Sequence, residues 1–118
     1  MIERAEIFAF ARKAFDVEPD YPFEKFPHYA VLRHGDDDKW FALIMDVDRQ
    51  RLGLDGEDKI DVIDIKCPPG KIDQLRRTEG FLPAYHMNKE HWITVPLDGS
   101  VSLSEVKRLL VESFDLTR

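Results

Sequence analysis

Two strand-like segments separated by a short polar turn constrain the fold of this chain most. Residues 29–34 (YAVLRH) and 39–47 (KWFALIMDV) are rich in aliphatic and aromatic side chains, and residues 35–38 (GDDD) separate them. Two such segments joined by a few turn residues are typical of a β-hairpin. Residues 59–66 (KIDVIDIK) alternate between apolar and polar positions and predict a third strand. The chain is therefore expected to build a mainly antiparallel sheet.

Amphipathic segments before and after these strands predict three helices. Residues 2–15 and 102–114 carry apolar side chains at helical spacing, and the second of these segments begins with a capping box, SLSE. A short helix is expected over residues 70–78, after a proline pair that stops the third strand. Residues 79–90 are expected to form an irregular connection, and residues 91–97 (HWITVPL) a fourth strand. The order helix–strand–strand–strand–helix–strand–helix predicts an α+β fold with the helices packed on one face of the sheet.

The size and composition indicate a single folded domain over residues 1–118. Apolar residues make up 43% of the chain and charged residues 34%, which is typical of a globular protein rather than a disordered one. No apolar run approaches the ~18 residues that a membrane span needs, and the amino terminus lacks a signal-peptide pattern. The one cysteine, Cys67, cannot form an internal disulfide. A cytoplasmic location without membrane contact is therefore expected.

Positive charge is concentrated in one part of an acidic chain. The formal net charge is −6, but residues 66–92 contain more basic than acidic side chains. The basic residues in this range are Lys66, Lys71, Arg76, Arg77 and Lys89, and the acidic ones are Asp73, Glu79 and Glu90. The overall acidity argues against strong nonspecific binding to a polyanion, because such binding depends on phosphate neutralisation by lysine and arginine.

The same positive range contains a dense cluster of polar and aromatic residues. Two histidines, an asparagine, a lysine and a tryptophan fall within the seven residues from His86 to Trp92. Lys89 supplies positive charge, Asn88 can donate and accept hydrogen bonds, and Trp92 or Tyr85 could stack on a nucleic-acid base. These residues form the most plausible binding group in the chain.

Each member of this cluster also has a purely structural explanation. Trp92 alternates with Ile93, which favours a place in the core for its indole ring. The side chain of Asn88 could cap the turn. For Lys89 and His91, a binding role and a plain solvent-exposed role both remain open.

Other patterns of catalytic or metal-binding chemistry are weak. His86 and His91 are five residues apart, whereas a helical metal site prefers four, and no HExxH motif is present. Cys67 stands at a strand end with no fixed base beside it, as structural cysteines often do. No nucleophile elbow, phosphate-binding glycine loop or dinucleotide fingerprint occurs. No catalytic residue, metal ligand or cofactor is therefore expected.

Several segments together resemble the MmcQ/YjbR family. Residues 84–95 (AYHMNKEHWITV), followed by 97–99 (LDG), resemble its signature, whose core is His-x-Asn-Lys-x-His-Trp. Residues 65–68 (IKCP) are similar to its middle section, and residues 40–42 (WFA) resemble part of its amino-terminal half. Where the family often has an aspartate after the cysteine, this chain has Pro68, which puts in doubt any role for a carboxylate there.

The resemblance implies an α+β fold like that of the bacterial frataxin homologue CyaY, with the "double wing" arrangement proposed to bind DNA. Carried over by position, the signature residues are His86, Asn88, Lys89, His91 and Trp92. Arg76, Arg77 and Lys71 are outside the signature and are added as candidate contacts because they are basic and close in sequence.

A non-enzymatic DNA-binding protein is the function expected from this resemblance and from the positive range. Lys89, Arg76 and Arg77 would contact phosphates, while Asn88 and His91 would contact sugars or base edges. The alternative is a binding module for a small anionic ligand or a protein partner, in which the His-Asn-Lys-His set forms a compact pocket. An enzyme that uses His86 or His91 as a general base is a third hypothesis, although no orienting carboxylate pairs with either histidine by spacing.

Overall fold

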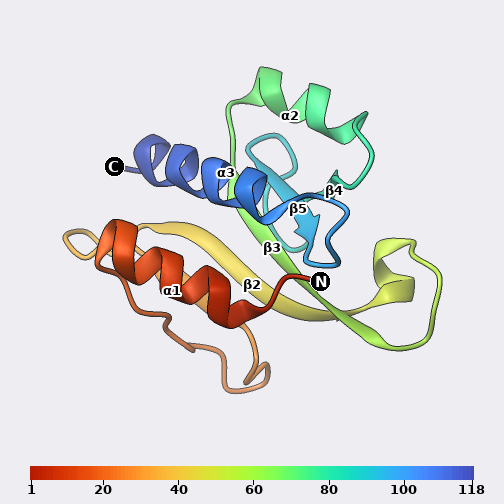
Figure 1. The fold of residues 1–118 in the computed structure, drawn as a ribbon, viewed down its shortest axis with the longest axis horizontal. Helices are drawn as coiled ribbons and strands as arrows, with labels where there is room; N and C mark the ends of the chain where they lie inside the picture. The colour runs from red at the N-terminus through yellow and green to blue at the C-terminus, as the bar shows by residue number, and fades with distance from the viewer.

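A five-stranded antiparallel sheet organises the molecule, and the computed structural model describes all of residues 1–118. The strands lie in the order β1-β2-β3-β5-β4, with the two central strands β2 and β3 paired over seven residues (Figure 1). In chain order the elements are α1 (Arg4–Phe15), β1 (Ala30–Arg33), β2 (Trp40–Asp48), the 3-10 helix η1 (Arg49–Leu52), β3 (Lys59–Lys66), α2 (Pro69–Arg76), β4 (Leu82–Pro83), β5 (Trp92–Pro96) and α3 (Leu103–Leu116). The α+β class expected from the sequence is confirmed.

The expected elements are present, with small differences at their ends. The third strand has the predicted bounds, residues 59–66, because the turn residues before it and the prolines after it both stop pairing there. The connection over residues 79–90 is not entirely irregular, since β4 pairs with β5 at Leu82 and Pro83. A two-residue strand at a sheet edge is too short to leave a period in the sequence. The last helix continues to Leu116, two residues beyond the predicted end.

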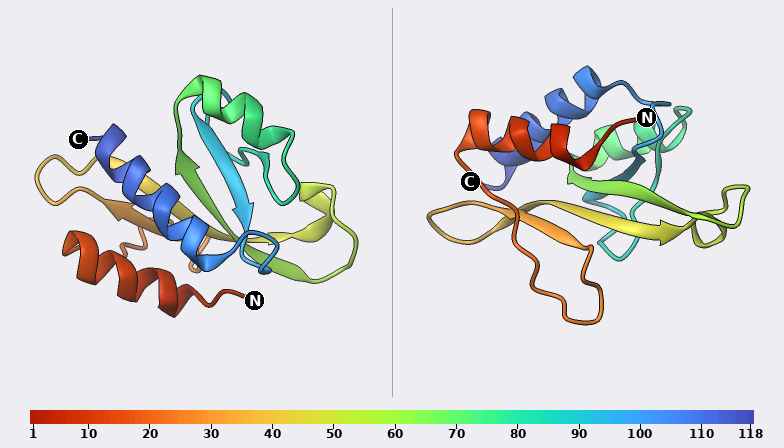
Figure 2. Two further views of the ribbon diagram at one scale, coloured as in Figure 1. Left: turned by 45° about the horizontal axis from the view of Figure 1, so that its top comes forward. Right: turned by 60° about the horizontal axis from the view of Figure 1, so that its bottom comes forward.

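The helices cover one face of the sheet, as the sequence predicts. Ile63 and Ile65 of β3, together with Ile93 and Val95 of β5, belong to a core cluster of 22 buried residues. That cluster also contains residues of all three α-helices: Ile7 and Ala11 of α1, Ile72 and Leu75 of α2, and Val106, Leu109 and Leu110 of α3. Figure 2 shows α1 and α3 side by side above the sheet.

A buried serine joins the last helix to the two central strands. Ser113 is fully buried, and its hydroxyl donates to the carbonyl oxygen of Phe41 at 2.6 Å and accepts from the backbone N–H of Lys66 at 3.1 Å. The pairing of β2 with β3 ends one position earlier, at Ala42 and Ile65. The hydroxyl therefore satisfies a strand carbonyl and a strand N–H at the point where the two strands separate.

The opposite face of the sheet is covered by loops rather than by helices. Its core is a separate cluster of seven buried residues: Tyr29, Val31, Leu43, Met45, Val47, Ile60 and Val62. Phe23 from the segment before β1, and Tyr85 and Met87 from the segment before β5, pack against this cluster. The segment before β1 is the orange loop that lies away from α1 and α3 in the right view of Figure 2. This loop-covered face, defined by the seven buried residues, carries the candidate sites described next.

Candidate functional site

The loop that carries the family-like signature is fixed to the loop-covered face by a chain of hydrogen bonds. The backbone N–H of Tyr85 donates to the Thr94 hydroxyl at 2.9 Å, and that hydroxyl donates to Oδ1 of Asp64. The next residue, His86, has a φ of 68°, in the left-handed region that few residues other than glycine adopt. The backbone of the loop is therefore held in one conformation from beneath, while His86 itself is solvent-exposed.

Asp64 is the most unusual polar group in the protein. Its side chain is completely buried, and Oδ2 has no hydrogen-bond partner. Burial raises the pKa of this carboxyl to about 7, although the Thr94 hydroxyl and, more weakly, Lys89 act in the opposite direction. Asp64 thus changes its charge near neutral pH directly beneath the signature loop.

Two residues of the predicted site have structural roles in the loop. Oδ1 of Asn88 accepts from the backbone N–H of Glu90 at 2.8 Å. The backbone carbonyl of Asn88 accepts from the N–H of Trp92 at 3.0 Å. Trp92 is only 8% exposed. Their place in the signature is therefore explained by the turn and by packing. The side chains of His86, Lys89 and His91 are exposed.

The basic residues of the predicted site differ in whether a carboxylate already binds them. Lys71 is not available to an anion, because its ammonium group binds both carboxylate oxygens of Glu112 on α3, at 3.0 and 2.8 Å. Arg76 and Lys89 have no carboxylate partner and line the same depression, of about 260 Å³, together with Asp73 and Glu90. Arg77 is exposed one residue beyond α2 and is not among the residues that line this depression. The structure therefore brings Arg76 and Lys89 together from two segments of the chain.

Cys67 has the environment of a structural cysteine. It is buried at the end of β3, and burial, with a contribution from Glu112, raises the pKa of its thiol to about 11. A thiol with a pKa that high is protonated at neutral pH and is a poor nucleophile. Nor does any group of three or more histidine, cysteine, aspartate and glutamate side chains lie close enough to hold a metal ion.

A second depression, which sequence reasoning missed, is hollowed into the loop-covered face. It has a volume of about 460 Å³ and combines aromatic residues with charged ones. Its lining comes from four parts of the chain: residues 25–29 before β1, residues 46–48 at the end of β2 with Arg51 of η1, Lys59 of β3, and Tyr85 of the signature loop. The one sequence signal for it is the run KFPHY at residues 25–29, in which basic and aromatic side chains alternate around a proline.

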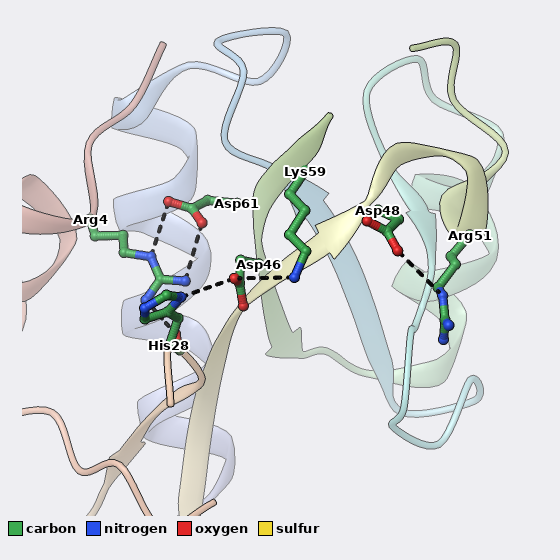
Figure 3. A network of polar contacts seen from close by, with 7 residues as sticks. All are labelled: Arg4, His28, Asp46, Asp48, Arg51, Lys59 and Asp61. Carbon is green, nitrogen blue, oxygen red and sulfur yellow. Dashed lines mark hydrogen bonds and ion pairs between the residues drawn. The ribbon is translucent and has the colours of Figure 1, made fainter. Parts of the chain in front are cut away.

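Charged side chains form a network across this depression (Figure 3). Asp46 lies between Nδ1 of His28, at 3.1 Å, and the ammonium group of Lys59, at 3.9 Å. Asp48 and the guanidinium of Arg51 are 3.7 Å apart. Beside them, Arg4 binds both carboxylate oxygens of Asp61, at 3.0 and 3.1 Å, and thereby ties α1 to β3.

The fold and the signature loop define a small α+β protein built on a five-stranded antiparallel sheet. The model of the YjbR family matches residues 12–116. The chain belongs to the YjbR family.

Relatives with sequence and structural similarity support the same assignment. The chain is 46% identical, over the full length of both proteins, to a Bacillus subtilis protein named "Uncharacterized protein YyaQ". It is also similar to a crystal structure of a protein from Pseudomonas syringae, with 49% identity, a TM-score of 0.96, and coverage of 99% of this chain and 100% of that one. A Deinococcus radiodurans crystal structure shares the fold at 24% identity, with a TM-score of 0.77 over 98% of this chain and 78% of that one.

No helix of the protein has both the length and the apolar character that crossing a lipid bilayer requires.

Proposed function

We propose that this YjbR-family chain is a non-enzymatic DNA-binding protein that contacts phosphates through the end of α2 and the signature loop. The contacting side chains are those of Arg76, Arg77 and Lys89, with Lys66 beside them. His86 and His91 lie on the same exposed loop and can reach sugars or base edges. The family likeness and its double-wing arrangement support this proposal, as does the distribution of unpaired charge.

The distribution of unpaired cations is the observation that carries the proposal. Most lysine and arginine side chains have a carboxylate within 4.0 Å, but seven of the 17 do not: Lys13, Lys25, Lys66, Arg76, Arg77, Lys89 and Lys107. Four of these seven belong to residues 66–89, around α2 and the signature loop. A cation without a carboxylate partner can neutralise a phosphate without first breaking an ion pair.

The net charge of the chain limits how tightly it can hold DNA. At physiological salt, charges more than ~8 Å apart are largely screened, so that the local excess at α2 acts more strongly than the distant carboxylates. The neighbouring Asp73 and Glu90 still oppose binding, because they line the same depression as Arg76 and Lys89. We therefore expect binding that is weak and strongly dependent on salt.

Replacing Lys89 or Arg76 by alanine tests this surface. Each change should weaken binding to all DNA sequences alike and lower the slope of log K against log salt by about 1, because one phosphate contact is lost. Fluorescence anisotropy with labelled duplex and single-stranded DNA, at several salt concentrations starting from a low one, measures both quantities.

Lys13→Ala provides the matched control, since Lys13 is also an exposed cation without a carboxylate partner but lies on α1. It should leave the affinity and the salt slope unchanged. Absence of binding to either form of DNA at low salt contradicts the proposal, and so does an equal loss of affinity in the Lys13 variant.

A further inference from the structure

We propose that the 460 Å³ depression on the loop-covered face is a binding site for a small ligand that combines a flat aromatic ring with an anionic group, the chemistry of a 5′-mononucleotide. This site shares no residue with the proposed DNA surface, so the inference does not rest on that function. It rests on aromatic walls, loosely held cations and a suitable volume.

The aromatic part of the site is a stacked pair of rings, one of which is open to solvent. Phe26 and Tyr29 lie nearly parallel, with ring centroids 4.6 Å apart and an interplanar angle of 19°. Tyr29 is buried, whereas Phe26 is 47% exposed, so that an apolar ring stands at the edge of the depression. Tyr85 contributes the third ring of the lining. A planar ligand can stack on such a platform, and each nucleic-acid base has a face suited to this contact.

The cations of the site are loosely held. The nearest carboxylates to Arg51 and Lys59 are at 3.7 and 3.9 Å, beyond hydrogen-bond distance. Their side chains are 67% and 61% exposed. Lys25, the third basic residue of the lining, has no carboxylate partner. By contrast, Arg49, outside this lining, binds Asp58 at 2.8 Å.

These loose cations can turn toward an anion without the loss of a strong bond. Arg51 lines the same depression as Tyr85, so that its guanidinium stands beside the aromatic wall. A guanidinium binds phosphate oxygens through two parallel hydrogen bonds, which fixes both the position and the orientation of the group.

The two carboxylates that line the depression do not abolish its preference for an anionic ligand. Asp46 is shared by His28 and Lys59, and Asp48 faces Arg51, so that each carboxylate is already compensated (Figure 3). Lys25 therefore adds positive charge that no lining carboxylate balances. The other depression of similar volume, near Arg33, is lined by Asp16, Glu18, Asp20 and Asp38 and carries no aromatic side chain, so an aromatic anion would be repelled there.

The volume also suits a small ligand better than a macromolecule. Small-molecule sites usually occupy roughly 300–1,000 Å³, are concave, and combine apolar walls with a few polar groups. The depression falls in this range and has four hydrophobic residues among the 11 that line it. A 5′-mononucleotide would place its base against Phe26 and Tyr29 and its phosphate toward Arg51 and Lys59.

Titration of the ¹⁵N-labelled protein with AMP, GMP, CMP and UMP, followed by two-dimensional NMR, tests the site. At least one nucleotide should produce saturable shifts at residues 25–29, 46–51 and 85, and bind more tightly than inorganic phosphate or the matching nucleoside alone. Phe26→Ala and Arg51→Ala should each weaken that affinity roughly tenfold, because one removes a stacking contact and the other a charge-assisted hydrogen bond.

Both variants change exposed side chains, so the fold should survive, and unchanged spectra away from the depression would verify this. Lys13→Ala is the control, because it removes an exposed cation on α1 that lies outside both the depression and the proposed DNA surface, and it should leave nucleotide affinity unaltered. The proposal is overturned if none of the four nucleotides shifts these residues at millimolar concentration. It is equally overturned if inorganic phosphate binds as tightly as the nucleotides, or if Phe26→Ala has no effect. DNA binding that survives Phe26→Ala but falls in the Lys89 variant would show that the two surfaces act separately.

Discussion

Replacing Asp64 by asparagine is expected to raise the free energy of unfolding at pH 8 by about 2 kcal/mol. A carboxyl pKa of about 7 in the folded protein lies some three units above its ordinary value, so that burying the carboxylate at pH 8 costs about 4 kcal/mol. Asparagine has nearly the same shape and no charge, and its carbonyl oxygen can still accept the hydrogen bond from Thr94. Its amide nitrogen takes the place of Oδ2, which has no partner, and the unsatisfied N–H donors offset the gain by about 2 kcal/mol.

The sign of the pH dependence follows from where the proton is bound. Between about pH 4 and pH 7 the folded protein keeps the Asp64 proton while the unfolded chain has lost it. The contribution of this residue is therefore most favourable at acid pH, and it is lost as the pH rises, by about 1.4 kcal/mol for each pH unit in this window. Above pH 7 both states are ionised and the slope ends.

Urea denaturation of both proteins between pH 4 and pH 8.5 measures this effect. The difference in stability between the variant and the wild type should grow across the window and then stay constant, which separates Asp64 from the other titrating groups. Asp55→Asn, which changes an exposed aspartate in the loop before β3, is the control and should follow the wild type. A variant that is no more stable than the wild type at pH 8 would contradict the buried, unpartnered state of this carboxyl.

The buried carboxyl also shows where prediction from the sequence stops. In the segment KIDVIDIK, Asp61 and Asp64 are both polar but lie on opposite faces of the strand, because an odd number of positions separates them. Asp61 is half-buried and paired with Arg4, but Asp64 is completely buried under the signature loop. Strand periodicity reports which side chains share a face, not what covers that face. The signal that could have been used is that Asp64 shares its face with Ile60 and Val62.

Local patterns predicted the helices and the longer strands because each of them depends on its own spacing. The apolar run in β2, FALIM, leaves both faces of that strand buried, and this run could have indicated a second covering layer. What forms that layer is a loop with Phe23 on one side and the signature loop with Tyr85 on the other. Their packing depends on contacts between residues far apart in the chain, which a single sequence does not reveal.

The candidate site was likewise predicted where its residues are close in the sequence and missed where they are far apart. The sequence located the signature loop and the unpaired cations Arg76 and Lys89, because these lie within one short range. Sequence reasoning favoured the core for Trp92 and offered a turn-capping role for the side chain of Asn88, and the structure shows both roles. The aromatic depression was missed because its lining is drawn from residues 25–29, 46–48, 51, 59 and 85, which are far apart in the chain.

Ser113→Ala is expected to lower the free energy of unfolding by about 3 kcal/mol, since two buried backbone groups would each lose a partner at roughly 1–3 kcal/mol and the helix would regain about 0.5 kcal/mol from alanine. The carbonyl of Phe41 and the N–H of Lys66 are the two groups concerned. Alanine lacks the hydroxyl oxygen and leaves a void smaller than a water molecule in its place, so that neither group finds another partner at this fully buried position.

Thermal or urea denaturation of Ser113→Ala measures the loss, and Ser104→Ala is the matched control. Ser104 lies on the same helix but is exposed, so its replacement should leave stability unchanged or raise it by a few tenths of a kcal/mol. A loss below 1 kcal/mol for Ser113→Ala would mean that β2 and β3 close up and bond directly once the hydroxyl is gone. The full loss would instead show that α3 holds the two strands apart at this end of the sheet, so that helix and strands need one another to satisfy their backbone groups.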